Sequence, residues 1–119
     1  MSKFEGISEP AVSKSAQKSM RAKTKSFRLY KRSELSLEDI SMKFNPTLRG
    51  WLNYYGKFNP SEMSSVWRHF NKTLVAWAMR KYKRFRGRKT RAAKFIKGIA
   101  DKQPSLFAHW HAGMQGAFA

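Results

Sequence analysis

The feature that most constrains the fold is an apolar stripe at helical spacing in the middle of the chain. The stripe comprises Leu37, Ile40, Phe44, Leu48, Trp51, Tyr55 and Phe58. Steps of three and four residues place these side chains on one face of a helix. Pro46 interrupts the backbone hydrogen bonds without disturbing the phase, so the stretch forms either one kinked helix or two helices that meet at Asn45. Ser36, with Asp39 three residues later, predicts the N-terminal cap of this region.

The same period recurs on both sides of the stripe. One helix is predicted from Pro10 to about Lys31, with an apolar face and a separate basic stripe. Another is predicted to begin at the Asn-Pro-Ser-Glu motif of residues 59–62, with Asn59 as its cap, and to run toward Tyr82 until Gly87 breaks it.

A fourth helix is predicted over roughly residues 89–102, and Pro104 ends it. The apolar tail that follows is expected to pack partly on the helices. No alternation typical of a strand is found. The sequence therefore predicts an all-α fold, a compact bundle of four to five helices with a basic face.

The charge of the chain points to a polyanionic partner. Its 25 lysines and arginines face seven acidic residues, a formal net charge of +18 over 119 residues. Residues 80–97 alone hold ten basic side chains and no acid. A field of this sign attracts nucleic acid first, and membrane surfaces or acidic proteins less often.

Several classes of protein are disfavoured. The chain has no cysteine, which excludes disulfides, cysteine zinc sites and thiol catalysis. It has no run of 18 apolar residues and no apolar targeting segment at its start, so we expect a cytoplasmic protein without a membrane partner. Its first ten residues look more like a chain boundary than a targeting signal.

Catalytic chemistry finds little support. The acids are scattered, whereas two-metal phosphoryl chemistry needs clustered carboxylates. His109 and His111 would bind a metal only with further ligands, so a structural or RNA-contacting pair is favoured, and His69 is interpreted as a packed or surface residue. We expect no catalytic residue, no metal and no cofactor.

Aromatic residues are interleaved with the basic ones in residues 77–89. Basic groups hold phosphates, and aromatic rings can stack on exposed bases of structured or single-stranded RNA. Helical spacing favours Trp77 as a core residue. For Tyr82 and Phe85 both readings, core and stacking surface, stay open.

The segment "NPTLRGWLNYYGKF" of residues 45–58 is similar to the signature of the maturase-specific region, domain X, of group II intron-encoded proteins. "SEPAVSKSAQKSMRAKTKSF" resembles the start of that family's thumb, and "SLEDISMKF" its lead into domain X. "LVAWAMRKYKRFRGRK" and "QPSLFAHWHAGM" are similar to its later helix and C-terminal end. The resemblance covers nearly the whole chain, from about Ile7 to Met114. It implies a thumb-like N-terminal helix in residues 1–35 and a domain X-like helical region in residues 36–119, packed as one unit.

The resemblance implies a function without polymerase chemistry. The family's fingers and palm are absent, including the Tyr-x-Asp-Asp motif, and so is its Cys-rich endonuclease. We therefore expect no enzyme, but an RNA-binding fragment or remnant of an intron-encoded reverse transcriptase. It would bind group II intron RNA and stabilise the fold that is competent for splicing. The resemblance leaves open a DNA target and a dimer as further partners.

Two sets of residues are predicted from this resemblance and from the helical phase. In the signature, Asn45, Pro46, Gly50, Trp51 and Tyr55 are assigned structural roles together with Trp77, and Gly50 would allow a close helix approach or a bend. The predicted RNA-binding residues are Arg49, Asn53, Tyr54, Lys57, Arg80, Lys81, Tyr82, Lys83, Arg84, Arg86, Arg88, Lys89, Arg91 and Lys94, with Lys14, Lys18, Arg21, Lys25 and Arg28 as a second surface.

Two other classes of function stay open at this point. A general basic nucleic-acid-binding protein of ribosomal or chromatin type would have the same composition, and only the signature separates it from a maturase. A stand-alone nuclease is the enzymatic alternative, for which metal-dependent cleavage would be the test. A membrane-active cationic protein is less favoured, because the apolar residues are needed to close a helical core.

Overall fold

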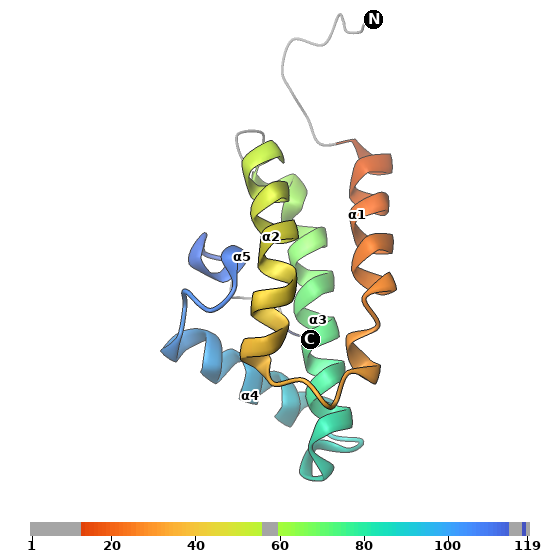
Figure 1. Cartoon of the computed structure of the whole chain (residues 1–119), viewed down its shortest axis with the longest axis vertical. Coiled ribbons are helices and arrows are strands. Elements are labelled where there is room, and N and C mark those ends of the chain that lie inside the picture. The colour runs from red at the N-terminus through yellow and green to blue at the C-terminus, as the bar shows by residue number, and fades with distance from the viewer. Residues whose placement is uncertain (1–12, 56–59, 115–117, 119) are drawn as a thin grey trace, which may run out of the picture.

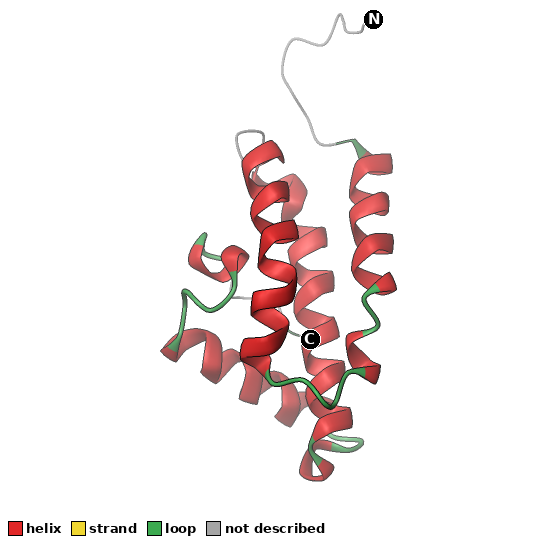
Figure 2. Cartoon of the chain, in the orientation of Figure 1, coloured by secondary structure: helices red, strands yellow, loops and turns green. Residues whose placement is uncertain are grey.

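The computed structural model describes residues 13–55, 60–114 and 118, and this part of the chain contains helices and loops but no strand (Figure 2). Its α-helices are α1 (Lys14–Ser26), α2 (Leu37–Tyr55), α3 (Ser64–Lys81), α4 (Lys89–Lys102) and α5 (Ala108–His111). Three short 3₁₀ turns, η1 (Leu29–Lys31), η2 (Pro60–Met63) and η3 (Lys83–Phe85), lie between them. The predicted all-α class is confirmed.

Helix α3 is the centre of the structure (Figure 1). α1 and α2 run alongside it, α4 contacts it near its C-terminal end, and α5 lies against α2. The sequence of α3 explains its central position, because the side chains on most of its circumference are apolar and buried. The fully or almost fully buried ones are Val66, Trp67, Phe70, Leu74, Val75, Trp77 and Ala78.

Helix α2 is one continuous helix through Pro46, so the alternative of two helices that meet at Asn45 is wrong. Its start is capped as predicted: the Ser36 backbone N–H donates to Asp39 Oδ2 (3.1 Å), and the Asp39 N–H donates to Ser36 Oγ (3.1 Å). Trp51 and Tyr55 are half-buried against the core, and the Trp51 and Trp67 rings are 6.3 Å apart. Phe58 lies outside the described residues.

The prediction of one helix from Pro10 to about Lys31 is wrong at its C-terminal end. Pro10 and Val12 lie outside the described residues, and α1 ends at Ser26. Arg28 then adopts a left-handed conformation (φ +52°), which turns Leu29 into the core and leaves Tyr30 exposed. Burial of Phe27 and Leu29 favours this turn, since Phe27 stacks on Phe44 with 4.1 Å between ring centroids.

The connection from η1 to α2 is held against the end of α3 by two side chains one helical turn apart. The Trp77 Nε1–H donates to the carbonyl oxygens of Arg32 (3.1 Å) and Leu35 (3.3 Å). Lys81 Nζ donates to the carbonyl oxygens of Ser33 (2.9 Å) and Leu35 (3.1 Å). The core role predicted for Trp77 is confirmed, as its side chain is buried.

The later segments follow the sequence pattern closely. α4 has the predicted bounds, and Ala92 and Ile96 on its inner face are fully buried. The N-terminus of α3 differs, because η2 occupies Pro60–Met63 and the α-helix begins at Ser64; the predicted cap Asn59 lies outside the described residues. The tail returns to the core as expected, with Phe107 and Trp110 fully buried.

Asn45 of the signature attaches this tail to α2. Its Nδ2 donates to the Leu106 carbonyl oxygen (3.0 Å), and its Oδ1 accepts from the Ala108 N–H (3.0 Å). Gly50 was predicted to allow a close helix approach or a bend, and the bend stays a prediction. It is exposed, and a Cβ added there would meet no atom within 4 Å, so the predicted close helix approach is wrong. In the described part of the chain, no helix is long and apolar enough to cross a membrane.

Asn45→Ala should lower the free energy of unfolding by about 1–3 kcal/mol, because it leaves a partly buried carbonyl and an N–H of the tail without partners. Asn53→Ala is the matched control, since Asn53 is exposed on the same helix and should change stability by no more than about 0.5 kcal/mol. Urea unfolding followed by circular dichroism measures both. Equal losses in the two variants would contradict the role assigned to Asn45.

Candidate nucleic-acid interface

The densest group of cations lies where α3 passes into α4, and we call residues 80–94 the basic turn. α3 ends at Lys81 because Tyr82 adopts an extended conformation (φ −111°, ψ 118°). Gly87 (φ +71°) then allows the chain to reverse toward α4. The exposed cations of the basic turn are Arg80, Lys83, Arg84, Arg86, Arg88, Lys89, Arg91 and Lys94.

Aromatic side chains underlie the basic turn. Phe85 is buried and Tyr82 is half-buried. The Tyr82 ring lies 5.9 Å from Phe85 and 5.4 Å from Phe95, and the Phe85 and Phe95 rings are 5.1 Å apart. Phe85 is thus a core residue, and the half-buried Tyr82 packs in the same cluster, while its predicted contact with RNA stays a prediction.

Arg84 and Lys81 also support the turn itself. The Arg84 guanidinium lies over the rings of Tyr82, Phe85 and Phe95, at 4.7 to 5.4 Å from their centroids. Lys81 Nζ holds two backbone carbonyl oxygens and lies 5.6 Å from the centre of the Trp77 ring. The structure therefore gives Lys81 a structural position, although the sequence placed it among the RNA-binding residues.

The exposed charge of the turn is almost uncompensated. Between Met63 and the end of the chain, Asp101 is the single acidic residue. Within the part of the chain that the structure describes, the one side-chain ion pair joins Lys97 Nζ to Asp101 Oδ1 (2.9 Å) on α4. The exposed cations of the basic turn thus face solvent without a carboxylate partner among these residues.

The second predicted surface is carried by α1. Lys14, Lys18 and Lys25 are exposed, as expected for a solvent-facing stripe. Arg21 differs, because its Nη1 donates to Ser65 Oγ (3.0 Å) and so joins α1 to α3. Arg28 belongs to the turn before η1, not to the helical stripe, but it is exposed.

Lys72 on α3 extends the α1 surface, and the sequence analysis missed it. The pKa of His69 is lowered from 6.5 by burial first, then by the nearby charges of Arg21, Lys25 and Lys72. Each of these three cations is therefore near enough to the His69 imidazole to lower its pKa. The helix that contains Lys72 was predicted from its apolar positions. Helical phase alone therefore did not indicate that Lys72 belongs to the same surface as the cations of α1.

The signature residues predicted to contact RNA form a third, separate surface. Arg49, Asn53 and Tyr54 are exposed on α2, and Lys57 lies outside the described residues. Arg49 borders a hollow of about 390 Å³ between α2 and α5, together with Ser105 and His111. Tyr54 is next to the last residue of α2, and in Figure 1 that end of α2 lies far from the connection between α3 and α4, so these surfaces do not merge into one site.

The two histidines of the tail have different positions. His109 is fully buried: its Nε2 lies 2.6 Å from Asn71 Oδ1, which also accepts from Trp110 Nε1 (3.0 Å). His111 is exposed, with Nδ1 3.4 Å from Ser105 Oγ. The described residues contain no group of three potential metal ligands. The structural reading is confirmed for His109, whereas no pattern in the sequence identified its partner Asn71.

Burial lowers the pKa of His109 from 6.5 to about 3. Asn71 Oδ1 accepts the Trp110 N–H, so the neutral imidazole donates to it from Nε2. Nδ1 is buried and has no hydrogen-bond partner among the described residues. A second proton would therefore create a buried cation whose new N–H meets no acceptor.

Comparison with known proteins gives one result. A family model described as "Group II intron, maturase-specific domain" matches residues 17–95, about two thirds of the chain. The matched region begins inside α1, contains α2 and α3, and ends inside α4. Neither the curated proteins nor the solved structures gave a match.

The buried neutral His109 should make the fold sensitive to acid. The unfolded state gains the proton near pH 6.5 while the folded state resists it to about pH 3, so stability is full above pH 6.5 and falls below it. One such group contributes a slope of up to about 1.4 kcal/mol per pH unit. We expect His109→Gln to reduce the fall in unfolding free energy between pH 7 and 5, a window above the ordinary pKa values of carboxylates.

His111→Gln is the matched control, because it removes an exposed imidazole two residues away. His69 contributes in the same direction as His109 and is present in both variants. Denaturant unfolding at several pH values measures the slopes. The assignment is wrong if His109→Gln and His111→Gln show the same dependence on pH.

Proposed function

The chain belongs to the family of group II intron maturase-specific domains, and on that premise we propose that it binds folded intron RNA and stabilises the splicing-competent fold. The basic turn is the principal contact in this proposal, and the α1 surface is a second one. The observation that carries it is a run of exposed cations with no carboxylate partner among the described residues, fixed on a well-packed base.

The geometry favours phosphate binding over base reading. The cations of the basic turn lie on the outside of a chain reversal, and the aromatic cluster below fixes the backbone that carries them. Guanidinium groups bind phosphate oxygens through paired N–H donors. A fixed backbone reduces the conformational entropy that such contacts must overcome.

Such a surface would act by differential binding. A compact RNA fold brings phosphates close together, and their repulsion raises its free energy. A dense set of cations therefore stabilises the compact fold more than a looser one. A ligand with this preference shifts the population toward the compact fold. The maturase-specific domain is not catalytic in itself, so the chemistry of splicing is proposed to belong to the RNA.

The second surface supports a proposal about domain organisation. We infer that residues 1–35 correspond to a thumb-like N-terminal helix and that residues 36–119 correspond to domain X. Arg21 and Gln17 of α1 meet at Ser65 of α3, since Ser65 Oγ donates to Gln17 Oε1 (3.1 Å). Contacts of this kind would keep the α1 cations in a fixed relation to α3.

The first test compares partners at matched salt. With roughly eight phosphates contacted, affinity for a group II intron transcript should fall by about 10³-fold or more between 50 and 200 mM salt. Filter binding would measure it, with unrelated structured RNA and duplex DNA as competitors. Full displacement by either competitor at equal concentration would favour the alternative, a general nucleic-acid-binding protein of ribosomal or chromatin type.

The second test compares two double substitutions on α4, one that lowers the net charge and one that does not. Arg91→Gln with Lys94→Gln removes two exposed cations and should reduce the salt slope by about 1.4 to 1.8, that is 0.7 to 0.9 for each lost contact. Lys97→Gln with Asp101→Asn removes an ion pair without changing the net charge. It should leave the slope unchanged, and an equal effect of the two double variants would contradict the proposed contact surface.

A further inference from the structure

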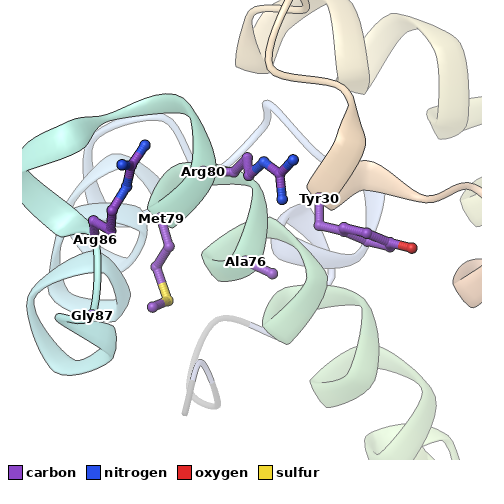
Figure 3. Close-up of a pocket in the computed structure, with 6 residues that line it drawn as sticks. All are labelled: Tyr30, Ala76, Met79, Arg80, Arg86 and Gly87. Atoms are coloured by element: carbon purple, nitrogen blue, oxygen red, sulfur yellow. The ribbon is translucent and has the colours of Figure 1, made fainter.

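A hollow of about 510 Å³ lies beside the basic turn, between η1 and the end of α3 (Figure 3). Tyr30 borders it from η1, and Arg86 and Gly87 border it from the turn. Ala76, Met79 and Arg80 border it from α3. Its volume is within the range of about 300–1,000 Å³ that is typical of small-ligand sites.

The lining combines an apolar side with two cations. The Tyr30 ring, Ala76 and the Met79 thioether provide the apolar side. In Figure 3 the Arg80 guanidinium extends toward Tyr30, and Met79 lies between Arg80 and Arg86. Both guanidinium groups are exposed, and neither makes a hydrogen bond or ion pair to the described protein residues. Rings and thioethers favour flat apolar groups, whereas guanidinium groups favour phosphates.

Two backbone conformations create the hollow. The left-handed Arg28 sends Leu29 inward and Tyr30 outward, so that Tyr30 keeps 42% of its surface exposed. At Gly87 (φ +71°) a side chain is absent, and a Cβ placed there would meet no atom within 4 Å. The hollow therefore stays open on the side of the turn. Lys31 Nζ, 5.8 Å from the centre of the Tyr30 ring, adds a third cation nearby.

The chemistry of the lining identifies its occupant. An unpaired nucleotide offers a flat base for an aromatic ring and phosphates on either side for cations. The lining contains no carboxylate, so it has nothing to neutralise a basic peptide. An acidic peptide would satisfy the two arginines but would leave Tyr30 and Met79 without a flat partner.

We propose that this hollow binds one unstacked nucleotide of the RNA, with its base on Tyr30 and Met79 and its flanking phosphates on Arg80 and Arg86. The inference rests on the proposed function and adds to it. The basic turn alone would recognise phosphates wherever they crowd, whereas the hollow would select RNA that exposes an unpaired base at that place. A maturase surface with such a pocket distinguishes a folded junction from a continuous duplex.

The test separates base from phosphate with two probes of equal charge. One is an eight-residue oligoadenylate, and the other is the same ribose-phosphate chain without bases. Stacking of one base contributes a factor of about 5 to 150 in affinity. We expect the wild type to prefer the oligoadenylate by a factor in this range, measured by fluorescence anisotropy at fixed salt.

The variants locate that preference. Tyr30→Ala should abolish it while leaving the affinity for the abasic chain unchanged, and Tyr30→Phe should retain it, because the ring is needed and the hydroxyl is not. Ala76→Leu, which fills the hollow from α3, should also reduce the preference without removing a cation. Met42→Ala is the control, since Met42 is exposed on α2, does not line the hollow and is not among the predicted RNA-binding residues. Circular dichroism melting curves verify that each variant is folded.

The outcomes distinguish this inference from the proposed function. If the wild type binds intron RNA with steep salt dependence but shows no preference for the oligoadenylate, the hollow is not a base site and the proposed function stands. An unchanged preference in Tyr30→Ala, or an equal loss in Met42→Ala, overturns the inference in the same way. Displacement of oligoadenylate by octaglutamate at equal concentration would assign the hollow to acidic peptides. Failure to bind intron RNA at all overturns the proposed function and this inference with it.

Discussion

The basic turn and the hollow beside it both depend on one interaction, the attachment of the α1–α2 connection to the end of α3. Trp77 and Lys81 are one turn apart on α3, and together they hold the carbonyl oxygens of residues 32–35. Without these donors the connection would have partly buried carbonyl groups and no fixed path. Because η1 precedes this connection directly, its position next to the basic turn follows from the same bonds.

The basic turn holds many positive charges that repel one another. The aromatic cluster of Tyr82, Phe85 and Phe95 beneath it provides packing that opposes this repulsion. Arg84 is attracted to the faces of three rings, so one cation of the turn contributes to cohesion as well as to charge. The remaining cations repel one another, and salt screens that repulsion within about 10 Å at 0.1 M. Fold stability and RNA affinity therefore respond to salt in opposite directions, because added ions relieve the protein while they compete with it for phosphates.

The sequence predicts those parts of the structure that depend on local spacing. The capped start of α2, the bounds of α4 and the buried position of Trp77 all follow from helical period and capping chemistry. The break at Arg28 could not be predicted, because arginine carries no local preference for a left-handed backbone. Its cause is the burial of Phe27 and Leu29 against residues distant in the sequence.

The sequence predicted the positive charge of the candidate site, but not which of its residues face solvent and which contact the rest of the protein. Composition located the basic turn, yet Lys81 and Arg84 bond inward, and Tyr82 belongs to the cluster below. Each of these residues has the same local pattern as its exposed neighbours. The tyrosine that the fold leaves at the surface next to the turn is Tyr30, which lies beyond the end of α1 in a segment that was predicted to be helical.

The bonds from Asn45 to residues 106 and 108 have a consequence for where the folding unit ends. The region that the family model matches stops at residue 95, inside α4, but the signature asparagine uses its side chain on a segment beyond that point. Phe107, His109 and Trp110 of that segment fill space between α2 and α3 that the matched region leaves unfilled. The matched region is thus shorter than the unit of folding, and a chain cut at residue 95 would keep the signature while exposing the apolar surfaces that the tail covers.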